Sequence, residues 1–263
     1  MDFMSTKRFE NKVAVVTGAS RGIGQAIALS FAREGAHVVG VASGNQSETS
    51  AKAQALGAKF TAATEDFAKL TQKRAAELVA QIVRDCGRVD ILVNNAGIIK
   101  RAPIVDHSEA DWNAVLQINL SAPFFLSQAV AKWWLTAGRE KSAPDARLKV
   151  VNIASILSFQ GGILVPGYTA SKSGIAGITK AFANELAKER CNFNAIAPGY
   201  IATDNTRALR EDPARNRAIL DRIPENRWGA PEDIAGAVMF LASKDADYLN
   251  GTVMNVDGGW LAR

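Results

Sequence analysis

The chain has few of the residues from which disulfide frameworks and zinc sites are built. Only Cys86 and Cys191 occur, far apart and in no CxxC pair, and His37 and His107 are the only histidines among 263 residues. This usage is typical of a reducing compartment and argues against a disulfide scaffold. We therefore expect no metal site and a cytoplasmic location, the latter also because residues 1–12 contain no apolar signal-peptide core.

Long uninterrupted apolar runs and a strong charge of one sign are also lacking. Residues 112–131 and 150–171 carry no formal charge, but polar side chains interrupt the first stretch, and glycine and proline break the second. We expect neither to span a membrane. Lysine and arginine number 31 against 26 acidic residues, a net charge of +5. This small, unclustered excess favours an anionic small-molecule partner and predicts no binding of nucleic acid.

Short β-branched runs alternate with longer amphipathic stretches along the whole chain. The runs predict strands at 13–17, 37–41, 59–63, 91–94, 149–153, 192–196 and 252–256. The stretches predict helices at 24–34, 46–56, 70–86, 108–136, 168–188 and 231–242. Such alternation is typical of βα units whose strands are covered on both faces. It predicts one domain, residues 1–263: a Rossmann-type, doubly wound parallel sheet of about seven strands with helices on both faces.

One region, residues 198–229, does not follow this alternation and is rich in Arg, Asp, Asn and Pro. A connection beyond the carboxyl end of a strand overhangs the ligand crevice of an open α/β sheet. We therefore expect an irregular substrate lid here. The alternative is a solvated surface insertion.

The predicted first strand runs directly into a glycine-rich turn, TGASRGIG at residues 17–24. Glycines let the backbone approach a pyrophosphate, which the free amides at the following helix N-terminus stabilise, so the turn predicts a bound dinucleotide. The acid that usually pairs with the 2′-hydroxyl of NAD is missing from the end of the second strand, VGVASG. A 2′-phosphate on Arg21 or Ser43 is thus compatible with the sequence, and the residues lean slightly to NADP. Alternatively, Arg21 lies over the adenine edge or in solvent.

A tyrosine and a lysine, Tyr168 and Lys172, lie four positions apart in a helical pattern and therefore on one face. A phenol ordinarily titrates at about pH 10, and a nearby ammonium favours the phenolate. The spacing predicts that Lys172 lowers the pKa of Tyr168, which would then act as general acid or base on an alcohol or carbonyl. Ser155, after the predicted fifth strand, is expected to hydrogen-bond the same oxygen.

The motifs occur together, in order, over essentially the whole chain: TGASRGIG, NNAG at 94–97, the serine before YTASK, and PGYIAT at 198–203. In this combination the chain resembles the short-chain dehydrogenase/reductase family. The resemblance implies hydride transfer between NAD(P)(H) and a secondary alcohol or ketone, and a homotetramer in which two apolar helices pair between subunits. It also implies a catalytic tetrad, with Asn119 holding a water of the proton relay: Asn119, Ser155, Tyr168 and Lys172.

The same resemblance implies which residues hold the cofactor. Lys172 would contact the nicotinamide ribose, and Asp66 and Phe67 the adenine. Asn94, Ala96 and Gly97 would line the adenine-ribose side, and Ile201 with Thr203 would hold the carboxamide. The expected set is Gly18, Ser20, Arg21, Gly22, Ile23, Gly24, Ser43, Asp66, Phe67, Asn94, Ala96, Gly97, Tyr168, Lys172, Pro198, Gly199, Ile201 and Thr203.

Three further segments, NIASILSFQGG, ILDRIPENRWG and VDGGWLAR, carry a narrower resemblance. They are similar to the subfamily that acts on 2-dehydro-3-deoxy-D-gluconate and 2-deoxy-D-gluconate in pectin and uronate breakdown, usually with NAD. A sugar acid needs a cation for its carboxylate and polar groups for its hydroxyls. Candidates, each equally a solvated surface residue, are Lys100, Arg101, Gln160 and Arg207. Trp228 and Trp260 fit as pocket walls or as packing anchors.

Other functions stay open at this point. A fold does not set its substrate, so a carbonyl reductase for a 3-oxoacyl thioester or another polyol is the nearest alternative. A dinucleotide sensor would not need the tetrad. A nucleic-acid binder would need a basic helix face or interleaved aromatic and basic residues, neither of which the sequence contains.

Overall fold

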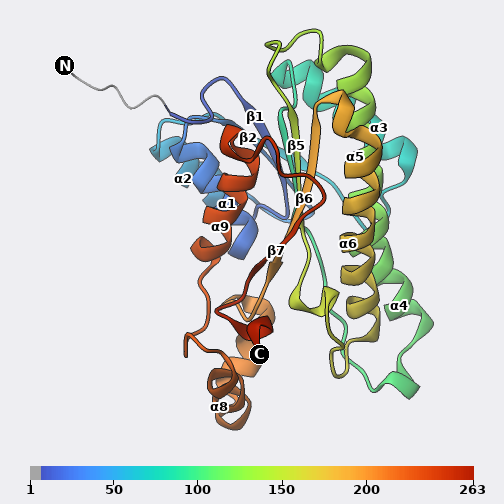
Figure 1. The fold of residues 1–263 in the computed structure, drawn as a ribbon, viewed down its shortest axis with the longest axis vertical. Coiled ribbons are helices and arrows are strands. Elements are labelled where there is room, and N and C mark those ends of the chain that lie inside the picture. The colour runs from blue at the N-terminus through green and yellow to red at the C-terminus, as the bar shows by residue number, and fades with distance from the viewer. Residues whose placement is uncertain (1–6) are drawn as a thin grey trace, which may run out of the picture.

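The computed structural model describes residues 7–263, so the first six residues of the segment 1–12 lie outside the described part. Seven parallel strands form one sheet in the order β3-β2-β1-β4-β5-β6-β7, between two layers of helices (Figure 1). The strands are β1 (Val13–Thr17), β2 (His37–Ala42), β3 (Phe60–Thr64), β4 (Ile91–Asn94), β5 (Leu148–Ile153), β6 (Cys191–Pro198) and β7 (Val253–Val256). The doubly wound parallel sheet is confirmed, and each predicted strand is present with ends that differ by at most two residues.

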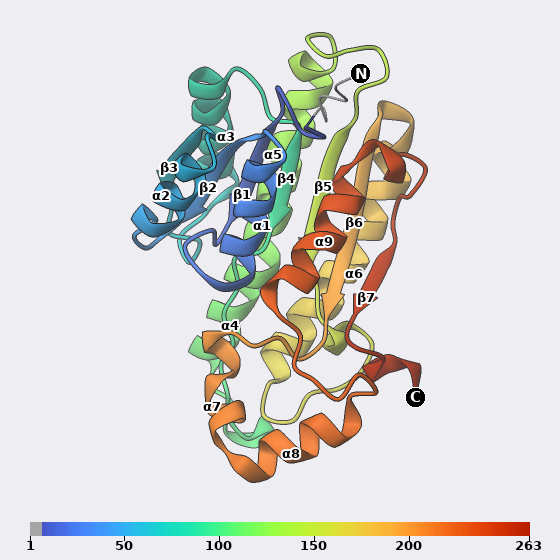
Figure 2. The ribbon, with the colours of Figure 1, turned by 90° about the vertical axis from the view of Figure 1, so that its left-hand side faces the viewer.

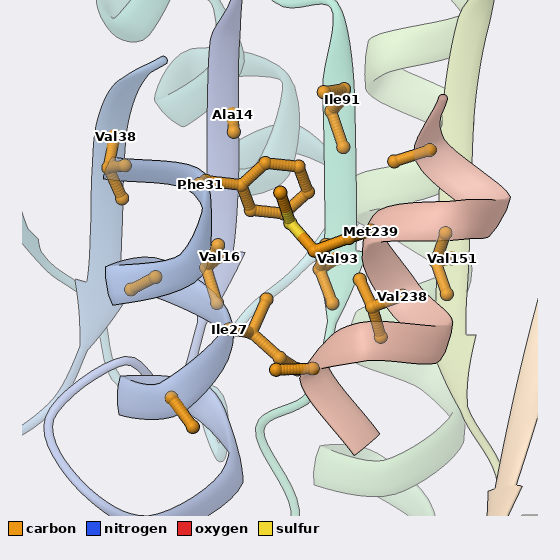
Figure 3. Packing of buried hydrophobic residues seen from close by; sticks show 14 of the residues in the cluster. Ala14, Val16, Ile27, Phe31, Val38, Ile91, Val93, Val151, Val238 and Met239 are labelled. Atoms are coloured by element: carbon orange, nitrogen blue, oxygen red, sulfur yellow. The ribbon is translucent and has the colours of Figure 1, made fainter. Parts of the chain in front are cut away.

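One face of the sheet is covered by α1 (Gly22–Arg33), α2 (Ser47–Ala55) and α9 (Pro231–Ala242). Helices α1 and α9 come from opposite ends of the chain but pack side by side, and Figure 3 shows their side chains meeting over the central strands. Ile27 and Phe31 of α1 lie four positions apart and so share a face, as do Ile234 and Val238 of α9. All four are completely buried. Their contact joins the two halves of the chain into one core.

The other face is covered by α3 (Gln72–Cys86), α5 (Ala122–Trp133) and α6 (Pro166–Leu186), with α4 (Glu109–Leu116) running into α5. The predicted helix 108–136 is present, but π turns at Gln117–Ser121 and Trp134–Gly138 interrupt it. By length and composition alone the stretch Glu109–Gly138 could cross a membrane. In the structure, 44% of its most apolar 18-residue segment is buried inside the protein. Its Leu126, Val130 and Trp134 pack in the core beside the sheet, as in the core helix of an α/β fold.

The segment 198–229 is not irregular, and that prediction was wrong. It contains a 3-10 turn (Asp204–Thr206) and two short helices, α7 (Arg207–Glu211) and α8 (Pro213–Arg222), which lie beyond the carboxyl ends of the strands (Figure 2). Asp212 caps α8 by accepting hydrogen bonds from the amides of Ala214 (3.0 Å) and Arg215 (3.1 Å). Proline at the next position is preorganised for a helix start, so the Asp-Pro pair was the missed signal.

A small separate core holds α8 in place. It consists of Ile156, Ile219, Ile223 and Trp260, and therefore joins α8 to the loop after β5 and to the turn at Trp260–Ala262. Trp260 is 4% exposed and is a packing anchor, with the guanidinium of Arg222 3.9 Å from its ring centroid. Arg263 Nη2 donates to the carbonyl of Asp221 at 2.9 Å, near the end of α8.

Candidate active site

The turn between β1 and α1 has room for a phosphate only because three of its positions are glycine. Gly18 and Gly22 have φ of +69° and +56°, which other residues rarely adopt. A Cβ on Gly24 would lie 2.1 Å from the Gly18 carbonyl oxygen. The first turn of α1 has no acidic residue and its N-cap, Arg21, makes no side-chain capping bond. Helix amides there remain available for an anion, so this turn fits a dinucleotide pyrophosphate.

Hydrogen bonds fix this turn to the loop after β4. The hydroxyl oxygen of Thr17 accepts from the amides of Asn95 (2.9 Å) and Ala96 (3.0 Å). In return, Asn95 Nδ2 donates to the Thr17 carbonyl at 2.9 Å. The two loops meet where the strand order changes direction between β1 and β4, which is where open α/β sheets bind their ligands.

The side chain of Asn94, which was expected on the adenine-ribose side, does not line the cleft. It is 3% exposed, and its Nδ2 donates to Asn152 Oδ1 (2.8 Å) and to Ser127 Oγ (3.0 Å). Asn152 Nδ2 in turn donates to Thr179 Oγ1 at 2.9 Å. Asn94 is the last residue of β4 and supports the sheet against its helices. The next residue along the chain, Asn95, reaches the cleft instead.

A cleft of about 390 Å³ runs along the carboxyl ends of the strands and brings most of the expected residues together. The expected residues that line it are Gly18, Ser20, Arg21, Gly22, Ile23, Gly24, Ser43, Asp66, Phe67, Ala96, Gly97, Ser155, Tyr168, Lys172, Pro198, Gly199, Ile201 and Thr203. Sequence reasoning missed Ala42, Gly44, Asn95, Ile98, Ile118, Ile153, Ala154, Asp204, Asn205 and Thr206, which also line it. For most of these the only available signal was adjacency to a motif.

At one end of the cleft lie Ser155, Tyr168 and Lys172. Ser155 follows β5, and its Oγ accepts from the amide of Leu157 at 3.1 Å, which starts a 3-10 turn. Tyr168 and Lys172 lie in the first turns of α6, whose first residue is Pro166. The Lys172 Nζ lies 5.5 Å from the centre of the Tyr168 ring. The arrangement places the hydroxyl groups of Ser155 and Tyr168 and the ammonium of Lys172 around one point of the cleft.

Burial dominates the ionisation of both titratable groups. It raises the pKa of Tyr168, opposed by a hydrogen bond with Ser155 and by the charge of Arg101. It lowers the pKa of Lys172 to about 8. The net shift of the Tyr168 pKa is upward, so a lowering of this pKa by Lys172 stays a prediction. The ammonium points to the carbonyl of Ile153, 2.6 Å away, and is itself desolvated.

Asn119, the fourth expected member of the tetrad, lies beside the cleft and not in its wall. It is 1% exposed and sits in the π turn Gln117–Ser121, a feature frequent at functional sites. Its Oδ1 accepts from the amide of Ile98 (2.9 Å), and its Nδ2 donates to Ser171 Oγ at 3.2 Å. Ser171 Oγ donates to the Tyr168 carbonyl at 2.8 Å. The Asn119 side chain thus supports the helical turn that carries Tyr168.

Comparison with known proteins agrees with this geometry. A family model described as "Enoyl-(Acyl carrier protein) reductase" matches residues 18–261. The chain belongs to the short-chain dehydrogenase/reductase family. As a member it is an NAD(P)-dependent oxidoreductase that acts on CH–OH groups.

Several relatives of this short-chain dehydrogenase match it over nearly their whole length. The 2-dehydro-3-deoxy-D-gluconate 5-dehydrogenases of Escherichia coli and Dickeya dadantii are 49% and 48% identical, with 99% of each chain covered. A crystal structure from Agrobacterium tumefaciens, provisionally assigned as a 2-deoxy-D-gluconate 3-dehydrogenase with bound NADP, is 51% identical. It has a TM-score of 0.88 and covers 98% of this chain and 100% of its own.

Arg101 is the candidate substrate residue that lies nearest the chemistry of this short-chain dehydrogenase. Its charge acts on the pKa of Tyr168, and its Nη2 donates to the carbonyl of Asn205 at 3.3 Å. It therefore lies beside Asn205, which lines the cleft, although Arg101 itself does not line it. Within residues 7–263 no carboxylate forms an ion pair with it.

The other substrate candidates are engaged elsewhere. Lys100 pairs with Asp111 at 3.3 Å, and Arg207 pairs with Asp204. Gln160 accepts from Arg222, with 3.4 Å between the atoms. None of the three lines the cleft. Within the described part of the chain, no group of three or more His, Cys, Asp or Glu side chains is placed to hold a metal ion.

Proposed function

We propose that this protein transfers a hydride between NAD(P)(H) and the secondary alcohol or ketone of a keto-deoxy sugar acid. The substrate pair is 2-dehydro-3-deoxy-D-gluconate and 3-deoxy-D-glycero-2,5-hexodiulosonate. The observation that carries the proposal is the cleft at the carboxyl ends of the strands, where Ser155, Tyr168 and Lys172 lie together. The full-length similarity to sugar-acid dehydrogenases supports it.

When bound, the nicotinamide supplies or accepts the hydride. Tyr168 exchanges the proton with the substrate oxygen; its raised pKa keeps the hydroxyl protonated at neutral pH, as donation to a ketone requires. Ser155 donates a hydrogen bond to the same oxygen. Lys172 orients the cofactor ribose and keeps its ammonium near the ring of Tyr168. Asn119 holds the π turn at which a relay water meets the site.

The substrate carboxylate is assigned to Arg101. A guanidinium carries five N–H donors in a plane and binds a carboxylate in two-point fashion. Only one contact of Arg101, that to Asn205, is made within the described residues. Because Asn205 lines the cleft, a carboxylate bound by Arg101 would lie next to the cleft.

We also propose how the chain is organised around this reaction. Residues 1–263 work as one NAD(P)-binding domain, and residues 198–229 act as a substrate lid that contributes Ile201 and Thr203 to the cleft. The protein assembles as a cytoplasmic homotetramer through the apolar helices α5 and α6. Light scattering at micromolar concentration tests the assembly, and a stable monomer would contradict it.

The test is the initial rate with NADH and NADPH against 3-deoxy-D-glycero-2,5-hexodiulosonate and a panel of other keto acids and 3-oxoacyl thioesters. We expect kcat/KM of roughly 10⁴ M⁻¹s⁻¹ or above for the hexodiulosonate. Arg101→Gln should raise KM for this substrate at least about tenfold, whereas Lys100→Gln, at the neighbouring and paired lysine, should not. Turnover of a 3-oxoacyl thioester without turnover of the hexodiulosonate would replace the sugar-acid proposal.

A further inference from the structure

An ion pair crosses the cofactor cleft and joins two segments far apart in the chain. Arg21 Nη1 donates to Asp204 Oδ2 at 2.7 Å, although the residues are 183 positions apart. Arg21 is the N-cap of α1, in the glycine-rich turn. Asp204 begins the 3-10 turn of the lid, directly after Thr203. Both residues line the cleft, so their contact lies where a dinucleotide would pass between turn and lid.

The charges around this pair are unequal. Asp204 also accepts a hydrogen bond from Arg207, and the two arginines together hold its pKa below the usual range. Arg21, by contrast, has Asp204 as its one carboxylate partner within residues 7–263. If Arg21 moves away, Asp204 keeps Arg207 and stays paired. Releasing Arg21 therefore breaks one of the two contacts of Asp204 and leaves this carboxylate paired with Arg207.

The cleft wall that follows β2 offers the hydroxyl of Ser43 but no charged group. The residues there are Ala42, Ser43 and Gly44, and none carries a carboxylate that would repel a 2′-phosphate or hold a free 2′-hydroxyl. Of the two cations that line the cleft, Arg21 and Lys172, only Arg21 lies in the glycine-rich turn, where it can receive a phosphate. Its side chain is 68% exposed and free to change rotamer.

We propose that Asp204 sets the preference between NAD(H) and NADP(H) by competing with the 2′-phosphate for Arg21. With NAD(H) the ion pair persists and ties the lid to the glycine-rich turn. With NADP(H) the guanidinium turns to the phosphate, which it binds in two-point fashion, and leaves Asp204 to Arg207. The inference goes beyond the proposed substrate, since it concerns the coenzyme alone.

The two coenzymes should respond with opposite signs to loss of the carboxylate. Asp204→Asn frees Arg21 for a phosphate, so the Kd of NADPH should fall about three- to tenfold. The same change removes the tie across the cleft, so the Kd of NADH should rise about two- to fivefold, as expected for an exposed pair. A change in lid packing alone would move both Kd values in the same direction.

The experiment measures both Kd values by energy transfer from tryptophan to the reduced nicotinamide, without substrate, so that a failure of the sugar-acid assignment does not affect it. Asp204→Asn is compared with Arg21→Ala and with the double variant. We expect the gain for NADPH to vanish in the Arg21→Ala background and to shrink as salt is raised. A gain that survives without Arg21, or equal shifts for the two coenzymes, would overturn the proposal.

A second measurement needs no variant. In the unmodified protein, hydrogen exchange of the 3-10 turn Asp204–Thr206 and of α7 is followed with saturating NADH and with saturating NADPH. The proposal expects slower exchange with NADH, because the pair to Arg21 remains intact. Equal protection by both coenzymes, or greater protection by NADPH, would contradict it.

Discussion

The ammonium of Lys172 donates a hydrogen bond to the carbonyl of Ile153 at 2.6 Å, inside the protein. Lys172 is 5% exposed, and burial lowers its pKa to about 8. One hydrogen bond does not replace the hydration that the ammonium loses, so the charged form is held at a cost. The fold therefore places a desolvated ammonium, that of Lys172, beside Tyr168, which exchanges the proton.

This burial makes stability depend on pH in a specific window. An unfolded lysine titrates at 10.5 and the folded one at about 8, so between these values only the unfolded state binds the proton. Stability therefore increases with pH across the window and the penalty is fully present below it. Relative to Lys172→Met, the protein should gain up to about 3 kcal/mol from pH 7.5 to 10.5. Urea unfolding of both forms across this range measures it, and a constant difference would contradict the burial.

Removing a single oxygen at Tyr168 tests the proton transfer. Tyr168→Phe should lower kcat by about 10²- to 10⁴-fold, since a positioned acid or base contributes that much. The Kd of the reduced coenzyme should change by less than about threefold, because the ring and the Lys172 contact remain. Stopped-flow single turnovers, with equilibrium binding as control, give both quantities. Full activity of the variant would revive the reading of the protein as a sensor that binds dinucleotide without catalysis.

Gly24 tests whether the glycine-rich turn requires a residue without a side chain at this position. Gly24→Ala places a Cβ about 2 Å from a carbonyl oxygen, so the turn must open and coenzyme affinity should fall at least about tenfold. Gly236, exposed in α9 with nothing within 4 Å of its Cβ position, is the matched control. Gly236→Ala should stabilise the protein by about 0.5–1 kcal/mol and leave binding unchanged. Equal effects at both positions would argue against the phosphate cradle.

Trp260 supports the lid from outside the cleft. Trp260→Ala should destabilise the docking of α8 by about 3–5 kcal/mol, because it empties the small core around Ile219 and Ile223. Among residues 7–263 the indole Nε1 finds no hydrogen-bond partner, so Trp260→Phe should cost less than half as much. Proteolysis rates within α8 report the docking. Tyr248→Ala, at a fully exposed ring, serves as control and should stay within about 0.5 kcal/mol.

The doubly wound parallel sheet and most of the cleft wall could be predicted because local signals and the required topology agree. Strands apolar on both faces require helices on both sides, and a glycine turn after the first strand fixes the ligand end. The helices of the lid were missed because α7 and α8 are short and polar, and their start is encoded in one Asp-Pro pair.

The details of the site that the sequence did not predict have one physical origin. The direction in which a side chain points, and how far it is desolvated, are determined only when helices and strands pack together. Neighbouring asparagines in NNAG differ in role because Asn94 turns into the helical layer and Asn95 into the cleft. The four-residue spacing predicted that Tyr168 and Lys172 lie together. It did not predict that burial dominates the pKa of both groups or that the Lys172 ammonium donates to the Ile153 carbonyl. Asp204 follows a recognised motif directly, but its contact with Arg21 depends on the folded lid.

The packing of α1 against α9 bears on how the protein is made. On the ribosome, the apolar side of α1 and the strands beneath it emerge about 200 residues before Ile234 and Val238 arrive to cover them. Until then this surface is exposed to other chains and prone to association. Because the closing contact is so distant in sequence, the core is completed late and slowly. We expect nascent chains ending before α9 to depend on chaperones, and full-length chains to be released from them.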